Sequence, residues 1–356
     1  MKIAIALSGG VDSAVAGALL KDAGHTLIGV TALVWPDSRC CDANALRDAR
    51  LVAEALSIPY FTVDVMPEFK KTVVDPFVFD YQHGRTPNPC PLCNTYIRFG
   101  VMWERILEQY PDCGAVATGH YTIIEKDLAE NRWTLKKGVD ENKDQSYMLY
   151  GLSQEQLSRT LTPLGTYTKE QARALAEKFG LFVSKKPDSQ DACFVSGDYH
   201  QFLKDYADEA GGMIPGNIVD THGNVLGTHE GIVNYTIGQR KGLALQRKGE
   251  TNTPLYVVAI DAEKNQVIVG ADDEMCQPSC RVGDINWISP APESPINISV
   301  RIRYNSDEVP AQVIPEGDRN ATVFFEQPQR AVAPGQAAVF YDGEVVVGGG
   351  IIIQGG

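Results

Sequence analysis

Apolar runs and amphipathic stretches alternate along the first half of the chain. Four apolar runs have the length of buried strands, at residues 3–7, 27–34, 60–65 and 115–118. Stretches with the apolar spacing of a helix follow the first two runs. This order predicts an α/β fold with a doubly wound parallel sheet, whose ligands bind beyond the carboxyl ends of the strands.

The second half of the chain has a different pattern. Thr168 and Gln171 have capping-box spacing and predict one more helix, which ends before Gly180. After about residue 200, short β-rich segments and glycine- or proline-containing turns predict a small β-barrel or sandwich. We divide the chain into an α/β domain, a small middle domain and a C-terminal β-barrel domain, at residues 1–200, 201–272 and 273–356.

Composition and charge narrow the class of protein. The 356 residues are 44% hydrophobic and 22% charged, and no run approaches the roughly 18 apolar residues of a membrane span. The first strand starts at Lys2, so we predict a cytoplasmic protein with no membrane partner. Its eight cysteines are then thiols, metal ligands or catalysts. The net charge of −13 opposes nucleic-acid binding overall, but local patches decide that question.

A glycine-containing loop, SGGVDS at residues 8–13, separates the first strand from the first helix. Its backbone amides and the helix amino end favour an anion. Ser8 and Ser13 can donate hydrogen bonds, and Asp12 could hold Mg²⁺ against phosphates. The Walker lysine and the third glycine of a dinucleotide fingerprint are missing. The loop resembles the pyrophosphate loop of enzymes that split ATP into AMP and pyrophosphate.

Longer motifs narrow the field further. They are GRTPNPCPLCN at 84–94, ATGHY at 117–121, KDQSY at 143–147, SQDACF at 189–194, YTIGQRKG at 235–242 and PGQAAVFY at 334–341. Together they closely resemble the bacterial tRNA-specific 2-thiouridylase family, and the resemblance spans essentially the whole chain.

The resemblance implies an activity. ATP adenylates the C2 oxygen of the wobble uridine in the tRNA anticodon stem-loop, and sulfur then replaces that oxygen. The implied tRNAs read Lys, Glu and Gln codons. A cysteine thiolate is nucleophilic and can carry a persulfide sulfur. By analogy, Cys93 is the nucleophile and Cys193 carries a persulfide that an upstream sulfur-donor protein supplies. Transfer leaves a transient Cys93–Cys193 disulfide.

Cys90 departs from the pattern of this family, many of whose members carry Asp there as a proposed general base. Cys90, Cys93 and Cys193 supply three thiolates, which suit a 4Fe–4S cluster with one open iron that would hold a hydrosulfide. Zinc would want a fourth ligand, and the simplest alternative makes Cys90 a spectator. These alternatives stay open, as does the role of Cys40 and Cys41.

Family resemblance also implies the binding residues. Those expected to contact ATP, with Mg²⁺, are Ala6, Leu7, Ser8, Gly9, Gly10, Val11, Asp12, Ser13, Ala32 and Gly119. Those expected to contact the target base are Asn88, Pro89 and Cys90. Those expected to contact the rest of the RNA are Lys143, Asp144, Gln145, Arg303, Tyr304 and Gln336, and the middle domain is expected to contact tRNA too. His120 is either an RNA contact or a packed side chain.

Three rival functions remain. A pyrophosphate-loop ligase for a small molecule would turn over without Cys93. A non-catalytic tRNA-binding or sulfur-carrier protein would release no pyrophosphate, and the intact loop at residues 8–13 argues against it. The third rival is a 4-thiouridine enzyme. Such enzymes ordinarily have extra RNA-binding domains before the loop, whereas the loop here starts at residue 8.

Overall fold

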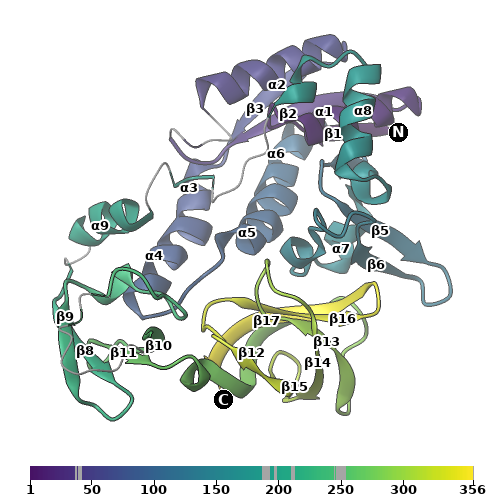
Figure 1. Cartoon of the computed structure of the whole chain (residues 1–356). Helices are drawn as coiled ribbons and strands as arrows, with labels where there is room; N and C mark the ends of the chain where they lie inside the picture. The colour runs from purple at the N-terminus through teal and green to yellow at the C-terminus, as the bar shows by residue number, and fades with distance from the viewer. Residues whose placement is uncertain are drawn as a thin grey trace.

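The computed structural model shows three parts (Figure 1): a sheet with helices at the top, β8–β11 at the lower left and a barrel at the lower right. It describes residues 1–36, 38, 42–186, 193–195, 199–209, 213–243, 245 and 254–355, without the side chains of 207–209. Cys40 and Cys41 lie outside the described residues.

A parallel sheet of five strands forms the centre of the first part. The strands are β1 (Lys2–Ala6), β2 (Thr26–Leu33), β3 (Tyr60–Asp64), β4 (Ala115–Ala117) and β7 (Thr160–Leu161). Their order is β3-β2-β1-β4-β7, and every pairing is parallel. The strand order reverses between β1 and β4, so this is the topological switch point at which such sheets bind ligands.

Helices cover both faces of this sheet. One face carries α1 (Val11–Asp22), α2 (Ala43–Ala55) and α8 (Lys169–Lys178). The other carries α3 (Met66–Phe69), η1 (Lys70–Val74), α4 (Asp75–Gln82), α5 (Pro89–Leu92), η2 (Cys93–Val101) and α6 (Met102–Gln109). Successive side chains of β1 point to opposite faces of the sheet. Ile3 and Ile5 enter the core under α1, α2 and α8, and Ala4 enters the second core, on the other face. The predicted doubly wound sheet is confirmed.

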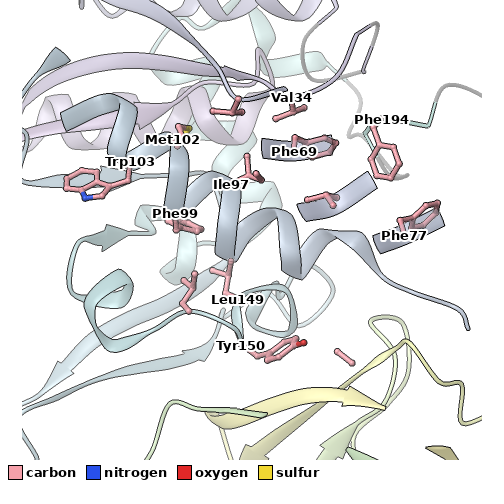
Figure 2. Close-up of a cluster of buried hydrophobic side chains, with 14 of the residues drawn as sticks. Val34, Phe69, Phe77, Ile97, Phe99, Met102, Trp103, Leu149, Tyr150 and Phe194 are labelled. Atoms are coloured by element: carbon pink, nitrogen blue, oxygen red, sulfur yellow. The ribbon is translucent and has the colours of Figure 1, made fainter. Parts of the chain in front are cut away.

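The second core extends beyond the sheet (Figure 2). Phe69 and Phe77 point toward Phe194, with ring centroids 5.6 Å and 5.4 Å away. Ile97 and Met102, from η2 and α6, are almost fully buried in the same cluster. The segment around Phe194 is therefore anchored against the helices that follow β3, although it lies far along the chain.

Several shorter elements complete the first part. They are β5 (Thr122–Asp127), β6 (Arg132–Lys137), η3 (Ser146–Leu149), α7 (Gln154–Ser158), η4 (Pro163–Thr166), η5 (Phe182–Lys185) and α9 (Tyr199–Glu209). Helix α8 begins with the predicted capping box, in which Thr168 and Gln171 bond each other's backbone amides. Gly180, just after its end, has φ +67°.

The middle part is a mixed sheet. Its elements are β8 (Gly216–Asp220), β9 (Val225–His229), η6 (Ile232–Asn234), β10 (Tyr256–Asp261) and β11 (Gln266–Gly270), and η7 (Asp273–Met275) follows. The strand order is β10-β11-β8-β9, with β11 and β8 parallel and the other neighbours antiparallel. Val257, Val267 and Val269 are buried beneath it.

The last part is a closed barrel of six antiparallel strands. The strands are β12 (Cys276–Trp287), β13 (Ile296–Arg301), β14 (Val309–Pro315), β15 (Ala321–Arg330), β16 (Ala337–Asp342) and β17 (Val345–Gly355). Pairing of β12 with β17 closes the order β12-β15-β14-β13-β16-β17. Closure decides between the predicted barrel and sandwich in favour of the barrel.

The barrel is tied to the first part. Lys136 of β6 pairs with Val345 of β17, so the β5–β6 hairpin extends the barrel sheet. The Asn286 side chain donates to the Tyr150 and Leu152 carbonyls at 2.7 Å and 3.0 Å. Within the described ranges, the chain has no helix long and apolar enough to span a membrane.

Candidate active site

A cavity of about 180 Å³ lies at the carboxyl ends of β1 and β4, at the switch point of the sheet. Seven of the residues expected to bind ATP line it: Ala6, Leu7, Ser8, Asp12, Ser13, Ala32 and Gly119. Thr31 and Val34 add the end of β2, and Cys93 and Arg98 add one wall from η2. The predicted phosphate loop and the predicted nucleophile therefore face one cavity.

The phosphate loop is held from behind by a lysine. Gly9 has φ +68°, and a Cβ there would lie 2.6 Å from the Ala45 carbonyl oxygen, so the turn requires glycine. The Lys186 ammonium donates to the Gly9 carbonyl at 2.9 Å and to Asp48 at 2.8 Å. The hydrogen bond from Lys186 lowers the pKa of Asp48. Gly10 is the N-cap residue of α1 and Val11 is its first residue, so the loop runs directly into the amino end of this helix.

Gly119 brings the end of β4 against the start of α1. A Cβ at Gly119 would lie 2.6 Å from the carbonyl carbon of Asp12 and 2.7 Å from the amide nitrogen of Ser13. Both contacts are to backbone, which a side-chain rotation cannot relieve. Glycine at this position therefore sets the spacing between the two chain segments that flank the cavity.

Asp12 is not a free carboxylate. Lys169, at the first position of α8, donates to its two oxygens at 2.7 Å and 2.9 Å, and the Tyr121 hydroxyl donates at 2.7 Å. The prediction that Asp12 holds Mg²⁺ did not anticipate this ion pair. Across the described residues, no three His, Cys, Asp or Glu side chains form a set that could hold a metal ion.

The first two site cysteines lie on the helical segment that starts at α5. Asn88 caps this helix by accepting a hydrogen bond from the Cys90 amide at 3.1 Å, and Pro89 is buried at its first position. Burial raises the pKa of the Cys90 thiol, against a weaker opposing effect of Arg98. Cys93, three residues on, lines the cavity. Asn88 and Pro89, predicted to contact the base, thus also position both cysteines.

Cys193 comes from the far end of the first part of the chain, and it is not among the residues that line the cavity. It packs against the hydrophobic core that Cys93 also touches, and its neighbour Phe194 is buried in that core. Cys90, Cys93 and Cys193 are not joined by disulfide bonds. These three cysteines are all described, yet they do not form a metal-binding set, so the ligands of the cluster and zinc alternatives are not assembled here.

His120 lies in the cavity wall and is only 6% exposed. Its Nδ1 shares a 2.7 Å hydrogen bond with the Thr118 hydroxyl. Desolvation, with a smaller effect of the nearby Arg98 charge, lowers the pKa of His120 to about 3, so the ring is neutral at physiological pH. His120 is therefore a packed side chain that also lines the cavity, and its contact with RNA stays a prediction.

Asp144 has a structural environment rather than an exposed one. It is 4% exposed, and its carboxylate accepts hydrogen bonds from the amides of Gly138 and Ser146 and from the Ser146 hydroxyl. Arg301 of the barrel approaches it at 3.5 Å. This placement argues against the predicted contact of the Asp144 side chain with RNA, because a buried charge needs these partners.

The neighbours of Asp144 differ from it. Gln145 lines the cavity, and its side-chain oxygen accepts from the Tyr121 amide at 3.1 Å. Lys143 is half-buried. Within the KDQSY motif, Asp144 thus faces Arg301 of the barrel, and Gln145 lines the cavity.

The barrel residues predicted to contact RNA lie at the junctions between parts. Arg303 and Tyr304 follow β13 in a turn, and the Arg303 guanidinium donates to the Ala331 carbonyl at 2.6 Å. The Tyr304 ring lies 5.9 Å from that of Tyr147. The Gln336 amide donates to the Thr86 carbonyl at 2.6 Å. Gln336 therefore holds the loop that leads into the cysteine-bearing helix.

Sequence reasoning missed three cationic residues of the site, Arg98, Lys169 and Lys186. Arg98 stands five residues after Cys93. This spacing indicates that the two residues share one helix face only if η2 is known to be a π-helix. Lys169 and Lys186 reach the phosphate loop from the distant α8 and η5 regions. Their positions in the sequence alone do not indicate these contacts.

The fold and the cavity define an ATP-using α/β enzyme with a cysteine in the nucleotide site and an appended barrel. Three family models match consecutive parts: a tRNA methyl transferase HUP domain, a tRNA methyl transferase PRC-barrel domain and an aminomethyltransferase beta-barrel domain, at residues 1–197, 200–271 and 277–352.

The curated relatives make the assignment specific. The chain is 45% identical to the tRNA-specific 2-thiouridylase MnmA of Acetivibrio thermocellus, over 99% of both chains. It is 48% identical to MnmA 1 of Caldanaerobacter subterraneus subsp. tengcongensis, over 99% of this chain and 97% of that one. The chain belongs to the tRNA-specific 2-thiouridylase family and is a tRNA-uridine 2-sulfurtransferase.

Solved structures resemble the chain more weakly. One is the U34-tRNA thiolase NcsA from Methanococcus maripaludis with its [4Fe-4S] cluster, at 20% identity and a TM-score of 0.34, covering 59% of this chain and 65% of that one. A likeness at this level carries no conclusion about the mechanism of this chain.

Proposed function

We propose that this enzyme adenylates the C2 oxygen of the wobble uridine in cytoplasmic tRNA and then transfers sulfur by a cysteine persulfide route. The observation that carries the proposal is that Cys93 lines the same cavity as Ser8, Asp12 and Gly119. A nucleophilic thiol and a phosphate-binding loop then act on one bound uridine. Proximity of this kind accounts for much of the rate of an enzyme.

The first step uses ATP and RNA. The uridine C2 oxygen attacks the α-phosphorus, the bond to the β-phosphate oxygen breaks, and pyrophosphate leaves. The amino end of α1, behind Ser8 and Gly10, suits the departing pyrophosphate. Mg²⁺, when bound, would neutralise phosphate charge, and Asp12, which is paired with Lys169, is the loop residue that would hold it.

The second step delivers sulfur. The Cys93 thiolate attacks the inner sulfur of a persulfide on Cys193, forms a disulfide and releases hydrosulfide. Hydrosulfide attacks C2 and displaces AMP, leaving 2-thiouridine. A thiol reductant then returns the disulfide to two thiols, and an upstream sulfur-donor protein reloads Cys193. Both cysteines pack against the same hydrophobic core, and the transfer requires that their sulfur atoms come into contact.

The iron–sulfur route is the alternative. It would need Cys90, Cys93 and Cys193 to come together as ligands, and these three described cysteines do not form a metal-binding set. This arrangement favours the persulfide route. Cys90 is then a packed neighbour of the base site.

The test is anaerobic purification followed by ATP-dependent thiolation of a Lys, Glu or Gln anticodon stem-loop, read by mass spectrometry. We expect a colourless protein whose Cys93→Ala and Cys193→Ala variants make no 2-thiouridine, while Cys90→Ala retains activity. The exposed Cys276 gives the matched control Cys276→Ala. A brown protein that loses colour and activity in all three site variants would establish the cluster route. Release of pyrophosphate without sulfur transfer would favour the small-molecule ligase.

A further inference from the structure

We propose that Arg98 is a catalytic residue that binds the α-phosphate of the nucleotide beside Cys93. The inference deepens the proposed function and rests on it for the identity of the reaction. It stands on three observations: the helical geometry that turns Arg98 into the cavity, the absence of a protein counter-charge, and the neutrality of the surrounding wall.

The π-helical form of η2 places Arg98 next to Cys93. In a π-helix the backbone bonds connect residues five apart, and the Met102 amide donates to the Ile97 carbonyl in this way. Residues five apart then lie almost one above the other. Cys93, Arg98 and Ile97 accordingly all line the cavity. An α-helix would rotate Arg98 away from the face that Cys93 occupies.

Arg98 is a cation without a counter-charge. Among the described residues, its guanidinium makes no hydrogen bond or ion pair with the protein. The two other cations of the site differ from it, because Lys169 is paired with Asp12 and Lys186 with Asp48. A half-buried guanidinium that faces a cavity and has no protein partner is suited to an anionic ligand.

The other groups around the cavity leave the charge of Arg98 uncompensated. His120 is neutral, since its pKa lies at about 3 through desolvation and, to a lesser extent, the Arg98 charge. The Arg98 charge also opposes the rise that burial causes in the pKa of the Cys90 thiol, so its electrostatic effect extends to Cys90 in α5. A phosphate bound here would meet one full positive charge.

The α-phosphate is the phosphate that this position selects. The β- and γ-phosphates leave together as pyrophosphate, for which the loop at Ser8–Ser13 is suited. The α-phosphate stays bonded to the uridine oxygen, so it must lie close to the point where hydrosulfide attacks C2. Cys93 releases this hydrosulfide, and Cys93 lines the same cavity wall as Arg98. Negative charge moves onto its oxygens when AMP leaves. A fork of guanidinium donors stabilises that charge in both steps.

The test compares two ligands that differ only in this phosphate. Adenosine and AMP are titrated by calorimetry into wild type, Arg98→Met and Arg98→Lys. Arg105→Met is the matched control, because Arg105 is half-exposed, pairs with Glu68 and Glu108, and does not line the cavity. We expect Arg98→Met to weaken AMP binding by about 10- to 100-fold and to leave adenosine binding unchanged. Arg98→Lys should retain part of the preference for AMP.

A kinetic measurement tests the catalytic role. Pyrophosphate release from ATP and an anticodon stem-loop, without a sulfur donor, should fall by about 100-fold in Arg98→Met at saturating ATP. An unchanged ratio of AMP to adenosine affinity, or unchanged pyrophosphate release, would overturn the inference. Failure of the wild type to release RNA-dependent pyrophosphate would instead refute the proposed function, which the nucleoside titrations do not require.

Discussion

Replacing Gly119 by alanine tests how tightly the end of β4 and the start of α1 must pack. The new Cβ would lie 2.6 Å from the Asp12 carbonyl carbon, whereas ordinary contacts begin at 3.4 Å. The two segments must therefore separate by about 0.8 Å. A strained insertion of this kind costs about 1–3 kcal/mol of stability. Misplacement of catalytic groups by about 1 Å lowers the rate roughly 100-fold.

The assay pairs thermal unfolding with RNA-dependent pyrophosphate release. We expect Gly119→Ala to remain folded and to lose about 100-fold in pyrophosphate release at saturating ATP. Gly180→Ala is the matched control, since Gly180 has φ +67° and open space around its Cα. An alanine there costs about 1–2 kcal/mol through its backbone conformation but disturbs nothing in the cavity. The two variants thus lose similar stability for different reasons.

The comparison has a result that refutes the reasoning. If Gly119→Ala releases pyrophosphate at the wild-type rate, then the spacing of Gly119 and Asp12 does not control the nucleotide site. If Gly180→Ala loses as much activity as Gly119→Ala, the loss reflects general destabilisation rather than displaced catalytic groups.

Three further predictions concern buried charge and the phosphate loop. The folded pKa of His120, about 3, lies below its ordinary value, so the unfolded chain binds the proton first and stability falls as the pH drops below about 6.5. Between pH 7 and pH 5 the wild type should lose about 2 kcal/mol of unfolding free energy through His120, and His120→Gln should not show this loss in urea unfolding. An unchanged pH dependence in the variant would contradict this. Asp144→Ala should lower stability by about 2–4 kcal/mol in thermal melts yet leave the tRNA affinity of folded protein within about twofold, because its carboxylate is buried among bonds to Ser146 and Arg301. Lys186→Met should raise the KM for ATP about tenfold, because the Gly9 carbonyl loses its hydrogen bond. Arg47→Met is the control: Arg47 is the exposed partner of Asp48, so its loss should leave this KM unchanged.

Local sequence signals predicted the parts of the site that lie within one segment. The turn at Ser8–Ser13 follows from glycines between a strand and a helix. The helix that starts at Asn88-Pro89 was not predicted, although Asn88 and Pro89 are local start signals. The capping box at Thr168 is likewise a local pattern, and the structure confirms it. Such signals depend on residues that are close together in the sequence, so they can be recognised from the sequence alone.

Contacts between distant segments escaped prediction. His120 and Asp144 belong to motifs rich in polar residues, yet tertiary packing buries both. Gln336 was expected to face RNA, and its amide bonds Thr86, which is 250 positions away. Polar side chains look alike in sequence whether they face solvent or a buried partner, so the pattern could not separate the two cases.

The sequence by itself determined the doubly wound sheet, the phosphate loop and the pair Cys90 and Cys93, because periodicity and turn chemistry are short-range properties. Only the tertiary structure decided which cations are neutralised. Lys169 and Lys186 reach the loop from distant segments and are paired. The π-helical register of η2 turns Arg98 into the cavity, where none of the described residues pairs with it. Charge compensation depends on distances through space, which the order of residues does not contain.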